Sequence, residues 1–166
     1  MKRVVICDAN ILIDYAKANK KIIGLATKHL YDIWVPLPIW EEVKDLLQGD
    51  IDALGLTIFE PKLEQIVEAS DRHGGGLSDE DKLCFIISRD EKAICATNDK
   101  NLRKICANNS IEVLWGLEMM IELCEAEKLG IVLAERVVRK IAQENITITD
   151  EIIKRFIERI NKSSAK

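Results

Sequence analysis

The chain has 166 residues, of which 48% are hydrophobic and 31% charged, and its formal net charge is −4 at pH 7. This length and apolar content predict one compact domain with a substantial core. The acidic balance, without a basic arm, argues against tight binding to long duplex DNA through phosphate neutralisation alone. Because the sequence shows neither a signal peptide nor an apolar run long enough to span a bilayer, we expect a cytoplasmic protein without membrane association.

The cysteines are isolated within apolar segments and form no CxxC pair. Since the chain has only two histidines, a zinc site is not expected. We expect buried, reduced thiols, as in a cytoplasmic protein. The five positions are Cys7, Cys84, Cys95, Cys106 and Cys124.

Strand patterns alternate with helix patterns over the first two thirds of the chain. The first strand is the β-branched run at 3–7, and helices at about 10–18 and 20–29 follow it. Pro38, which suits a first helical position, comes shortly after a second strand at 33–36. The remaining expected elements are, in order, a helix at 38–47, a strand at 56–59, helices at 63–72 and 77–89, a strand at 92–96, a helix at 98–107 and a strand at 111–114. This alternation predicts an α/β fold with a parallel, helix-covered sheet.

From about Gly116 onward the pattern is helical throughout. The expected helices lie at 117–128, 132–143 and 149–160. The last of them carries an apolar face that either packs on its own domain or docks a second chain; this face consists of Ile152, Ile153, Phe156, Ile157 and Ile160. We therefore divide the chain into an α/β core at 1–115 and a helical extension at 116–166, packed on the core or on a partner.

Four acidic residues, Asp8, Glu42, Asp81 and Asp99, each fall just past a predicted strand or at a helix start. Because parallel strands end at one edge of their sheet, these side chains are expected to share one crevice. Carboxylates brought together in this way repel one another strongly. Such a cluster is expected only with divalent cations, and all-oxygen ligands suit Mg²⁺ or Mn²⁺.

Each acid also has a purely structural interpretation. Asp8 could only cap the helix that follows it, and Asp99 could be a turn or cap residue. Glu42 could be a solvated helical glutamate, and its neighbour Glu41 is a rival for the second acidic position. Asp81 falls at the third position of its helix, where an acid bonds back to the N-cap and favours the helix dipole.

The four acids and their context resemble the PIN-domain nucleases over about the first 115 residues. The matching segments are Cys7-Asp8-Ala9-Asn10, Pro36-Leu37-Pro38-Ile39-Trp40-Glu41-Glu42-Val43, Leu77-Ser78-Asp79-Glu80-Asp81 and Thr97-Asn98-Asp99. The resemblance implies a three-layer α/β/α PIN-like fold with a central parallel sheet of four to five strands, plus C-terminal helices. It also implies Mg²⁺- or Mn²⁺-dependent cleavage of RNA.

The resemblance assigns roles to individual residues. Asp8 and Asp99 would be direct metal ligands, and Glu42 and Asp81 would complete the site directly or through water. The residues expected to orient ligands or contact phosphate are Asn10, Thr97 and Asn98. The expected substrate-binding cations are Lys82, Lys100 and Arg103, with Lys104 beside them and Arg72 and His73 as weaker candidates; all could equally be solvated surface charges.

Many small PIN-domain proteins are VapC-type toxins, usually dimers held by an antitoxin peptide. We therefore expect a homodimer, and leave open a toxin role, because the helical extension could occupy the antitoxin surface. One alternative is a PIN-like module that binds RNA or protein without cleaving. Another is a phosphatase of the haloacid dehalogenase type, which would need a second aspartate where this chain has Asn10.

Overall fold

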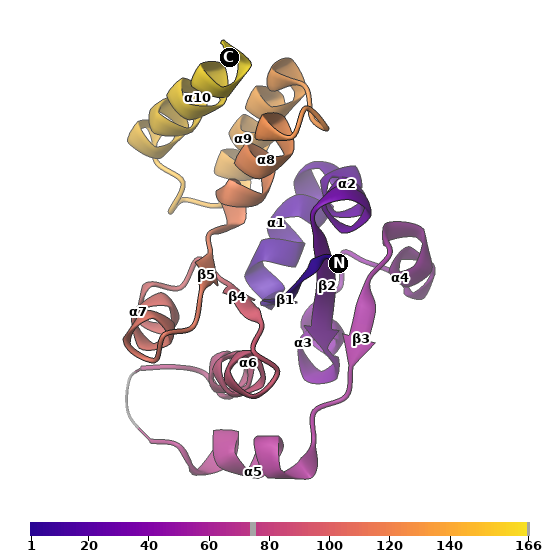
Figure 1. Ribbon diagram of the computed structural model, residues 1–166, viewed down its shortest axis with the longest axis vertical. Coiled ribbons are helices and arrows are strands. Elements are labelled where there is room, and N and C mark those ends of the chain that lie inside the picture. The colour runs from indigo at the N-terminus through magenta and orange to yellow at the C-terminus, as the bar shows by residue number, and fades with distance from the viewer. Residues whose placement is uncertain (74–75, 166) are drawn as a thin grey trace.

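A computed structural model describes residues 1–73 and 76–165 (Figure 1). The described residues form a five-stranded sheet in the order β3-β2-β1-β4-β5, and every neighbouring pair of strands is parallel. The strands are β1 (Arg3–Cys7), β2 (Tyr31–Pro36), β3 (Thr57–Phe59), β4 (Ile94–Ala96) and β5 (Val113–Leu114). The predicted α/β fold with a parallel sheet is confirmed.

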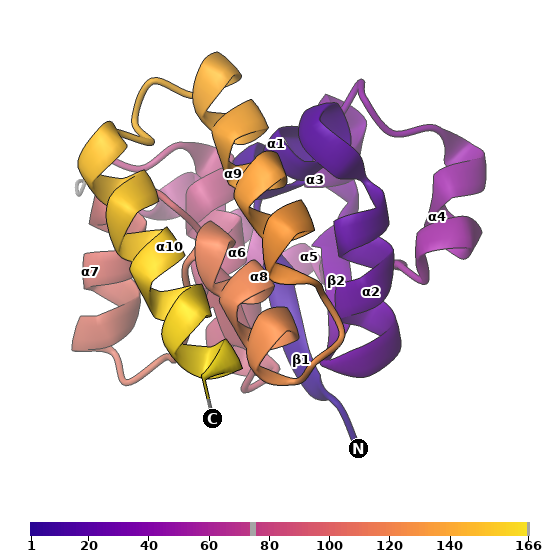
Figure 2. The same cartoon turned by 90° about the horizontal axis from the view of Figure 1, so that it is seen from above.

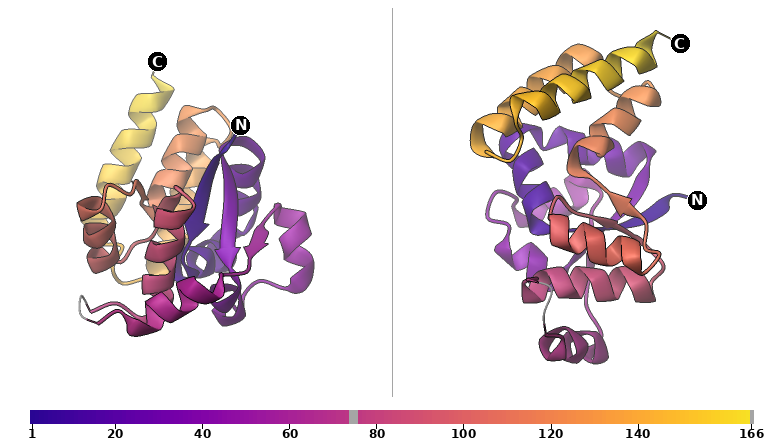
Figure 3. Two further views of the ribbon diagram at one scale, coloured as in Figure 1. Left: turned by 60° about the horizontal axis from the view of Figure 1, so that its bottom comes forward. Right: turned by 90° about the vertical axis from the view of Figure 1, so that its left-hand side faces the viewer.

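Helices cover both faces of this sheet. They are α1 (Ala9–Asn19), α2 (Lys21–His29), α3 (Leu37–Glu42), α4 (Gln48–Leu54), α5 (Leu63–Asp71), α6 (Asp79–Asp90), α7 (Lys100–Asn108), α8 (Gly116–Glu125), α9 (Ile131–Glu144) and α10 (Asp150–Ser164). α1, α2 and α8 lie on one face, and α6 and α7 lie on the other (Figure 3). The C-terminal helices α9 and α10 add a further layer outside α1 and α8, as predicted for a PIN-like fold with C-terminal helices.

The first strand forms the centre of the core. Val5, Ile6 and Cys7 are fully buried, because β1 is paired with β2 on one side and with β4 on the other. A strand covered on both faces requires a continuous apolar run, which this segment supplies. The N–H of Asp8 still donates to the Ala96 carbonyl at 3.2 Å, so the sheet holds the backbone of Asp8 in place.

The helix predicted at 38–47 is wrong in its second half. α3 ends at Glu42, and Val43 has extended backbone angles (φ −85°, ψ 99°). Val43 and Leu46 are both buried, so the helix-like spacing of these apolar residues belongs to a connecting segment that lies on the core. The sequence analysis also missed α4, whose start is stabilised by Asp50: its carboxylate accepts the Leu47 N–H at 2.8 Å.

The C-terminal helices pack on the chain's own core. α9 packs against α1, and α10 packs against α8 and α9 (Figure 2). Ile153, Phe156 and Ile160 of α10 are buried, which covers much of the apolar face found in the sequence. The buried side chains before and after residue 115 form one continuous cluster, and a domain boundary there stays a prediction.

Two further sequence expectations concern cysteines and membranes. The five cysteines are free and buried. Within 1–73 and 76–165, no helix has both the length and the apolar character that a bilayer crossing requires.

Candidate active site

The order of the strands defines a switch point between β1 and β4. From β1 the chain first builds outward through β2 and β3, and then returns to the other side of β1 with β4 and β5. In open α/β sheets, ligands bind beyond the carboxyl ends of the strands at such a point. Asp8 follows β1 and Thr97 follows β4, so both residues lie at this position.

Asp8 is held rigidly at the switch point. Its side chain caps α1, because Oδ1 accepts the Ile11 N–H at 3.1 Å. Its Oδ2 accepts a hydrogen bond from the Thr97 hydroxyl at 2.6 Å, and the Thr97 oxygen in turn accepts the Asp99 N–H at 3.0 Å. Thr97 thus connects two of the predicted acids and fixes the orientation of the first.

The electrostatic surroundings of Asp8 disfavour its charge. Asp8 is only 3% exposed, and its burial is the main reason that its pKa rises to about 6. The hydrogen bonds from Thr97 and Ile11 lower the pKa, while the charges of Asp81 and Asp99 raise it. Three carboxylates from distant parts of the sequence therefore act on one another at this edge of the sheet.

Asp99 and Asp81 both begin helices. Asp99 caps α7, with Oδ1 accepting the Leu102 N–H at 2.7 Å. Asp81 lies in the first turn of α6, where its N–H donates to the Ser78 hydroxyl at 3.1 Å. Burial, followed by the charge of Asp99, raises the pKa of Asp81, although hydrogen bonds with Ser78 oppose this. The capping roles considered from the sequence are therefore real, and they coexist with a place in the acidic cluster.

Glu42 reaches the same cluster from the end of α3. Burial, and then the charge of and a hydrogen bond with Glu80, raise the pKa of the Glu42 carboxyl, and Asp81 contributes as well. These contacts favour Glu42 over Glu41 as the second acid. Glu80 was not singled out from the sequence, although its position between Ser78 and Asp81 in a first helical turn was a usable signal.

The charges of these acids are not neutralised by ion pairs within the described residues. None of the ion pairs between described residues involves the acids of this cluster, which are Asp8, Glu42, Glu80, Asp81 and Asp99. Over the same part of the chain, no three His, Cys, Asp or Glu side chains are arranged closely enough to hold a metal ion. The carboxylates thus supply the oxygen donors that a hard divalent cation prefers, but they would have to move inward to coordinate it.

Comparison with models of protein families identifies a family for this chain. The family model of the PIN domain matches residues 4–162. The chain belongs to the PIN-domain family. PIN domains are generally nucleases and typically use divalent metals. No curated protein matches the chain. The family match extends past residue 115 through most of α10, so the C-terminal helices are part of the match.

Two amides beside the PIN-domain acids occupy different positions. Asn98 faces the start of α8, where its Oδ1 accepts the Gly116 N–H at 2.9 Å. A Cβ at Gly116 would lie 3.0 Å from Asn98 Nδ2, so glycine lets the two segments approach closely. Asn10 is exposed and lines a groove that also includes Asp99. Asn10 is therefore free to meet a ligand, whereas Asn98 holds the backbone next to Asp99.

The predicted substrate-binding cations of this PIN domain have different surroundings. Lys100 is exposed and lines the same groove as Asn10 and Asp99. Lys82 pairs with Asp79 at 3.6 Å and lines a different hollow, near α7. The guanidinium of Arg103 lies over the Trp115 ring, 4.8 Å from its centre. Of these three cations, Lys100 is the one on the groove beside the acids.

The weaker candidates also lie apart from the groove. The guanidinium of Arg72 is 4.7 Å from the centre of the Phe85 ring. His73 lines the hollow that contains Lys82, and Lys104 is exposed on α7.

Proposed function

We propose that this PIN-domain protein is a ribonuclease that hydrolyses phosphodiester bonds with Mg²⁺ or Mn²⁺. The observation that supports this proposal most strongly is the group of facing carboxylates around Asp8, which have no cationic partner among the described residues. Keeping such groups together disfavours their ionisation, and a divalent cation would remove that cost. Helix capping explains single acids such as Asp8 and Asp99, but it does not require the acids to lie together.

The roles follow from how each residue is held. Asp8 and Asp99 would be direct ligands, since Thr97 links them and fixes the Asp8 carboxylate. Glu42 and Asp81 would complete the site directly or through water. Bound metal ions supply activation of the attacking water and stabilisation of the in-line transition state. Asn10 would contact the substrate, and Asn98 would keep the segment before Asp99 in position.

RNA is favoured over long duplex DNA by the charge of the protein. A net charge of −4 and the lack of a basic arm in the sequence argue against neutralisation of many phosphates along a duplex. The exposed groove beside Asp99 instead has mixed polar and apolar character, which suits a short stretch of exposed nucleotides.

A toxin role and a homodimer stay predictions. Much of the apolar face of α10 is covered by α8 of the same chain, so little of this face is left for an antitoxin peptide to bind. A short overlapping reading frame upstream of the gene, and loss of growth arrest when it is co-expressed, would support the toxin role. The mass of the protein in solution tests the dimer.

The nuclease proposal is tested with purified protein and end-labelled RNA, both single-stranded and hairpin. We expect cleavage with Mg²⁺ or Mn²⁺ and none with EDTA. Glu42→Gln should reduce cleavage strongly, whereas the matched neighbour Glu41→Gln should not. Equal activity in EDTA, or an unaffected Glu42→Gln variant, would contradict the metal assignment. Mn²⁺ binding that Asp8→Asn does not change would favour a module that binds without cleaving.

A further inference from the structure

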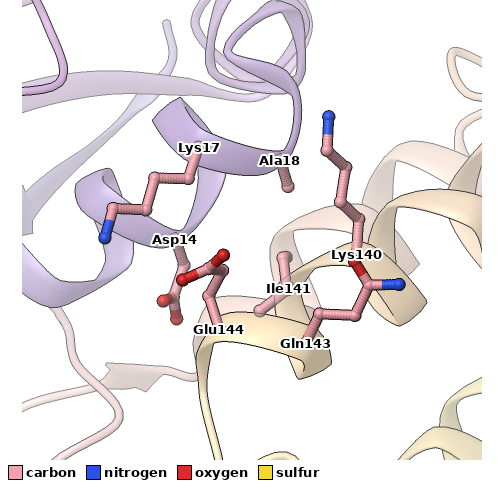
Figure 4. Close-up of a pocket in the computed structure, with 7 residues that line it drawn as sticks. All are labelled: Asp14, Lys17, Ala18, Lys140, Ile141, Gln143 and Glu144. Atoms are coloured by element: carbon pink, nitrogen blue, oxygen red, sulfur yellow. The ribbon is translucent and has the colours of Figure 1, made fainter.

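A groove leads from the acidic cluster to the C-terminal helices. It has a volume of about 650 Å³, and it runs from Asp99 past α1 to the loop that joins α9 to α10. Lys17 lies on its α1 wall, and the loop wall consists of 144–147. Asp14, Lys17 and Glu144 also line an adjoining hollow between α1 and α9, where their side chains lie around one space (Figure 4). The C-terminal helices thus form one wall of the groove beside the proposed site.

The loop at this wall is fixed by a single side chain. Asn145 Nδ2 donates to Asp14 Oδ2 at 2.9 Å, which ties the loop to α1. Asn145 Oδ1 accepts from the Thr147 N–H at 3.0 Å and from the Thr147 hydroxyl at 2.6 Å. Both polar atoms of the Asn145 amide are therefore engaged, Oδ1 within the loop and Nδ2 in the contact with α1. A side chain committed in this way positions its neighbours and does not itself contact a ligand.

The residue that Asn145 positions is Ile146, which is 92% exposed. An isolated surface isoleucine is ordinary on its own. Here, however, the isoleucine lies on a loop held by Asn145 and lines a groove of nucleotide size together with Asp99. A flat apolar group that enters the groove would pack against the Ile146 side chain.

We propose that this groove binds the nucleotide next to the scissile phosphate of a single RNA strand, with Ile146 against the face of an unpaired base. The inference rests on the proposed ribonuclease function and assigns the α9–α10 loop to substrate recognition. The groove carries Asp14, Asp99 and Glu144 against Lys17 and Lys100, so it attracts no polyanion by charge alone. Contact with the base must therefore supply affinity, and a base inside a duplex cannot offer its face.

Binding is measured with a fluorescent eight-nucleotide single-stranded RNA in an Asp8→Asn background, which prevents cleavage. Ile146→Ser should weaken binding about five- to tenfold, and Ile146→Trp should strengthen it, because aromatic rings stack on bases more favourably. Val132→Ser is the matched control: Val132 is 73% exposed at the start of α9 and does not line the groove. It should bind like the parent protein. The same RNA annealed into a duplex should not respond to either Ile146 change.

RNA cleavage, measured with Asp8 intact, provides a second test of the groove inference. Ile146→Ser should raise KM and leave kcat nearly unchanged, and it should broaden the base preference found by sequencing cleaved ends of a random RNA pool. If the unaltered chain cleaves RNA but the Ile146 series binds the single strand equally, the groove inference is overturned and the ribonuclease stands. If the chain never cleaves while the Ile146 series still changes binding, the ribonuclease proposal fails and the groove stands. Absence of any RNA binding overturns the groove inference.

Discussion

Acidic side chains at the two edges of the same sheet have opposite surroundings. At the amino edge, Arg3 Nη1 lies 3.1 Å from Glu112 Oε1, and Arg3 Nη2 lies 2.9 Å from Glu122 Oε2. The Tyr31 hydroxyl also donates to Glu122. At the carboxyl edge, Asp8 and its acidic neighbours receive hydrogen bonds from Thr97 and from backbone N–H groups, but they form no ion pair with any described residue.

The acids at the amino edge are held in ion pairs with Arg3, whereas those at the carboxyl edge lie beside one another. At the amino edge, Glu122 has Arg3 as its ion-pair partner. A carboxylate that is buried beside other carboxylates is destabilised in its charged form, as the raised pKa of Asp8 shows. Arg3 forms ion pairs with acids at one edge, and no such pair joins the acids of the other edge to a described residue. This difference supports the proposed metal site.

The largest expected difference between the two edges is catalytic. Asp8→Asn or Asp99→Asn should lower RNA cleavage by at least about 100-fold, because each removes an electrostatic group from the proposed site. Glu112→Gln removes a charge of the same kind at the amino edge and should leave cleavage within about twofold of the parent rate. Initial rates with saturating Mn²⁺ measure both, and circular dichroism confirms that each variant is folded. Comparable losses at the two edges would contradict the comparison.

Thr97→Val tests the hydroxyl that orders the carboxyl edge. The change is nearly isosteric, but it removes the donor to Asp8 Oδ2 and the acceptor of the Asp99 N–H. We expect cleavage to fall about 10- to 100-fold, as for other groups that orient metal ligands. The free energy of unfolding should fall by about 1–3 kcal/mol. Thr57→Val is the control, because Thr57 is exposed at the start of β3; equal effects in both variants would count against the assigned role.

The pH dependence of stability tests the charge balance at Asp8. The pKa of Asp8 rises from 3.8 unfolded to about 6 folded, so the native protein binds the proton more tightly. This favourable contribution is present in full below about pH 4 and is lost as the pH rises through 6. At pH 7 without metal, Asp8→Asn should therefore raise the free energy of unfolding by about 1–3 kcal/mol.

Chemical denaturation at pH 4 and pH 7 measures this effect. The two proteins should converge at pH 4, where Asp8 is protonated in the native state. Added Mn²⁺ should raise the melting temperature of the parent at pH 7 and have little effect on Asp8→Asn. A variant that is less stable than the parent at pH 7 would show that the Asp8 hydrogen bonds outweigh its burial.

The smallest expected effect concerns the cations around the carboxyl edge. Lys100→Ala should weaken RNA binding about two- to fivefold, the scale of one exposed charge. Lys82→Ala should change binding less, because Lys82 is paired with Asp79 and lines another hollow. Titrations at low and at moderate salt measure both affinities, and the Lys100 effect should shrink as salt increases. A larger loss for Lys82→Ala would move the RNA path to the hollow near α7.

The alternation of strands and helices was readable from the sequence, because local patterns determine it. The run from Val4 to Cys7 is apolar at successive positions, as expected for a strand inside a helix-covered sheet. The four acids were found by their position relative to strands. The prediction failed for the segment after Glu42, where Val43 and Leu46 have helical spacing but are buried within an irregular connection. Tertiary burial overrode the local period there.

The role of Thr97 could be expected only in outline from the sequence. Its hydroxyl contacts Asp8, 89 residues away, and that contact depends on β1 and β4 being neighbours in the sheet. Glu80 was missed for a similar reason, because only the fold brings it to Glu42. The α9–α10 loop was unpredictable as a groove wall, since its link to Asp14 spans 131 residues.

Gly116 has a consequence for the order in which the protein is made. The Gly116 N–H donates to Asn98 Oδ1, and the Tyr15 hydroxyl donates to the Gly116 carbonyl. Two core segments therefore reach their final contacts only after this residue has been made. The last of the four acids predicted from the sequence, Asp99, leaves the ribosome earlier than α8, and the core is closed later still by α10. We therefore expect a nascent chain to carry all four predicted site acids before it can hold them in place. Nuclease competence would then arrive only after α10 has been made, as a timing property of the fold.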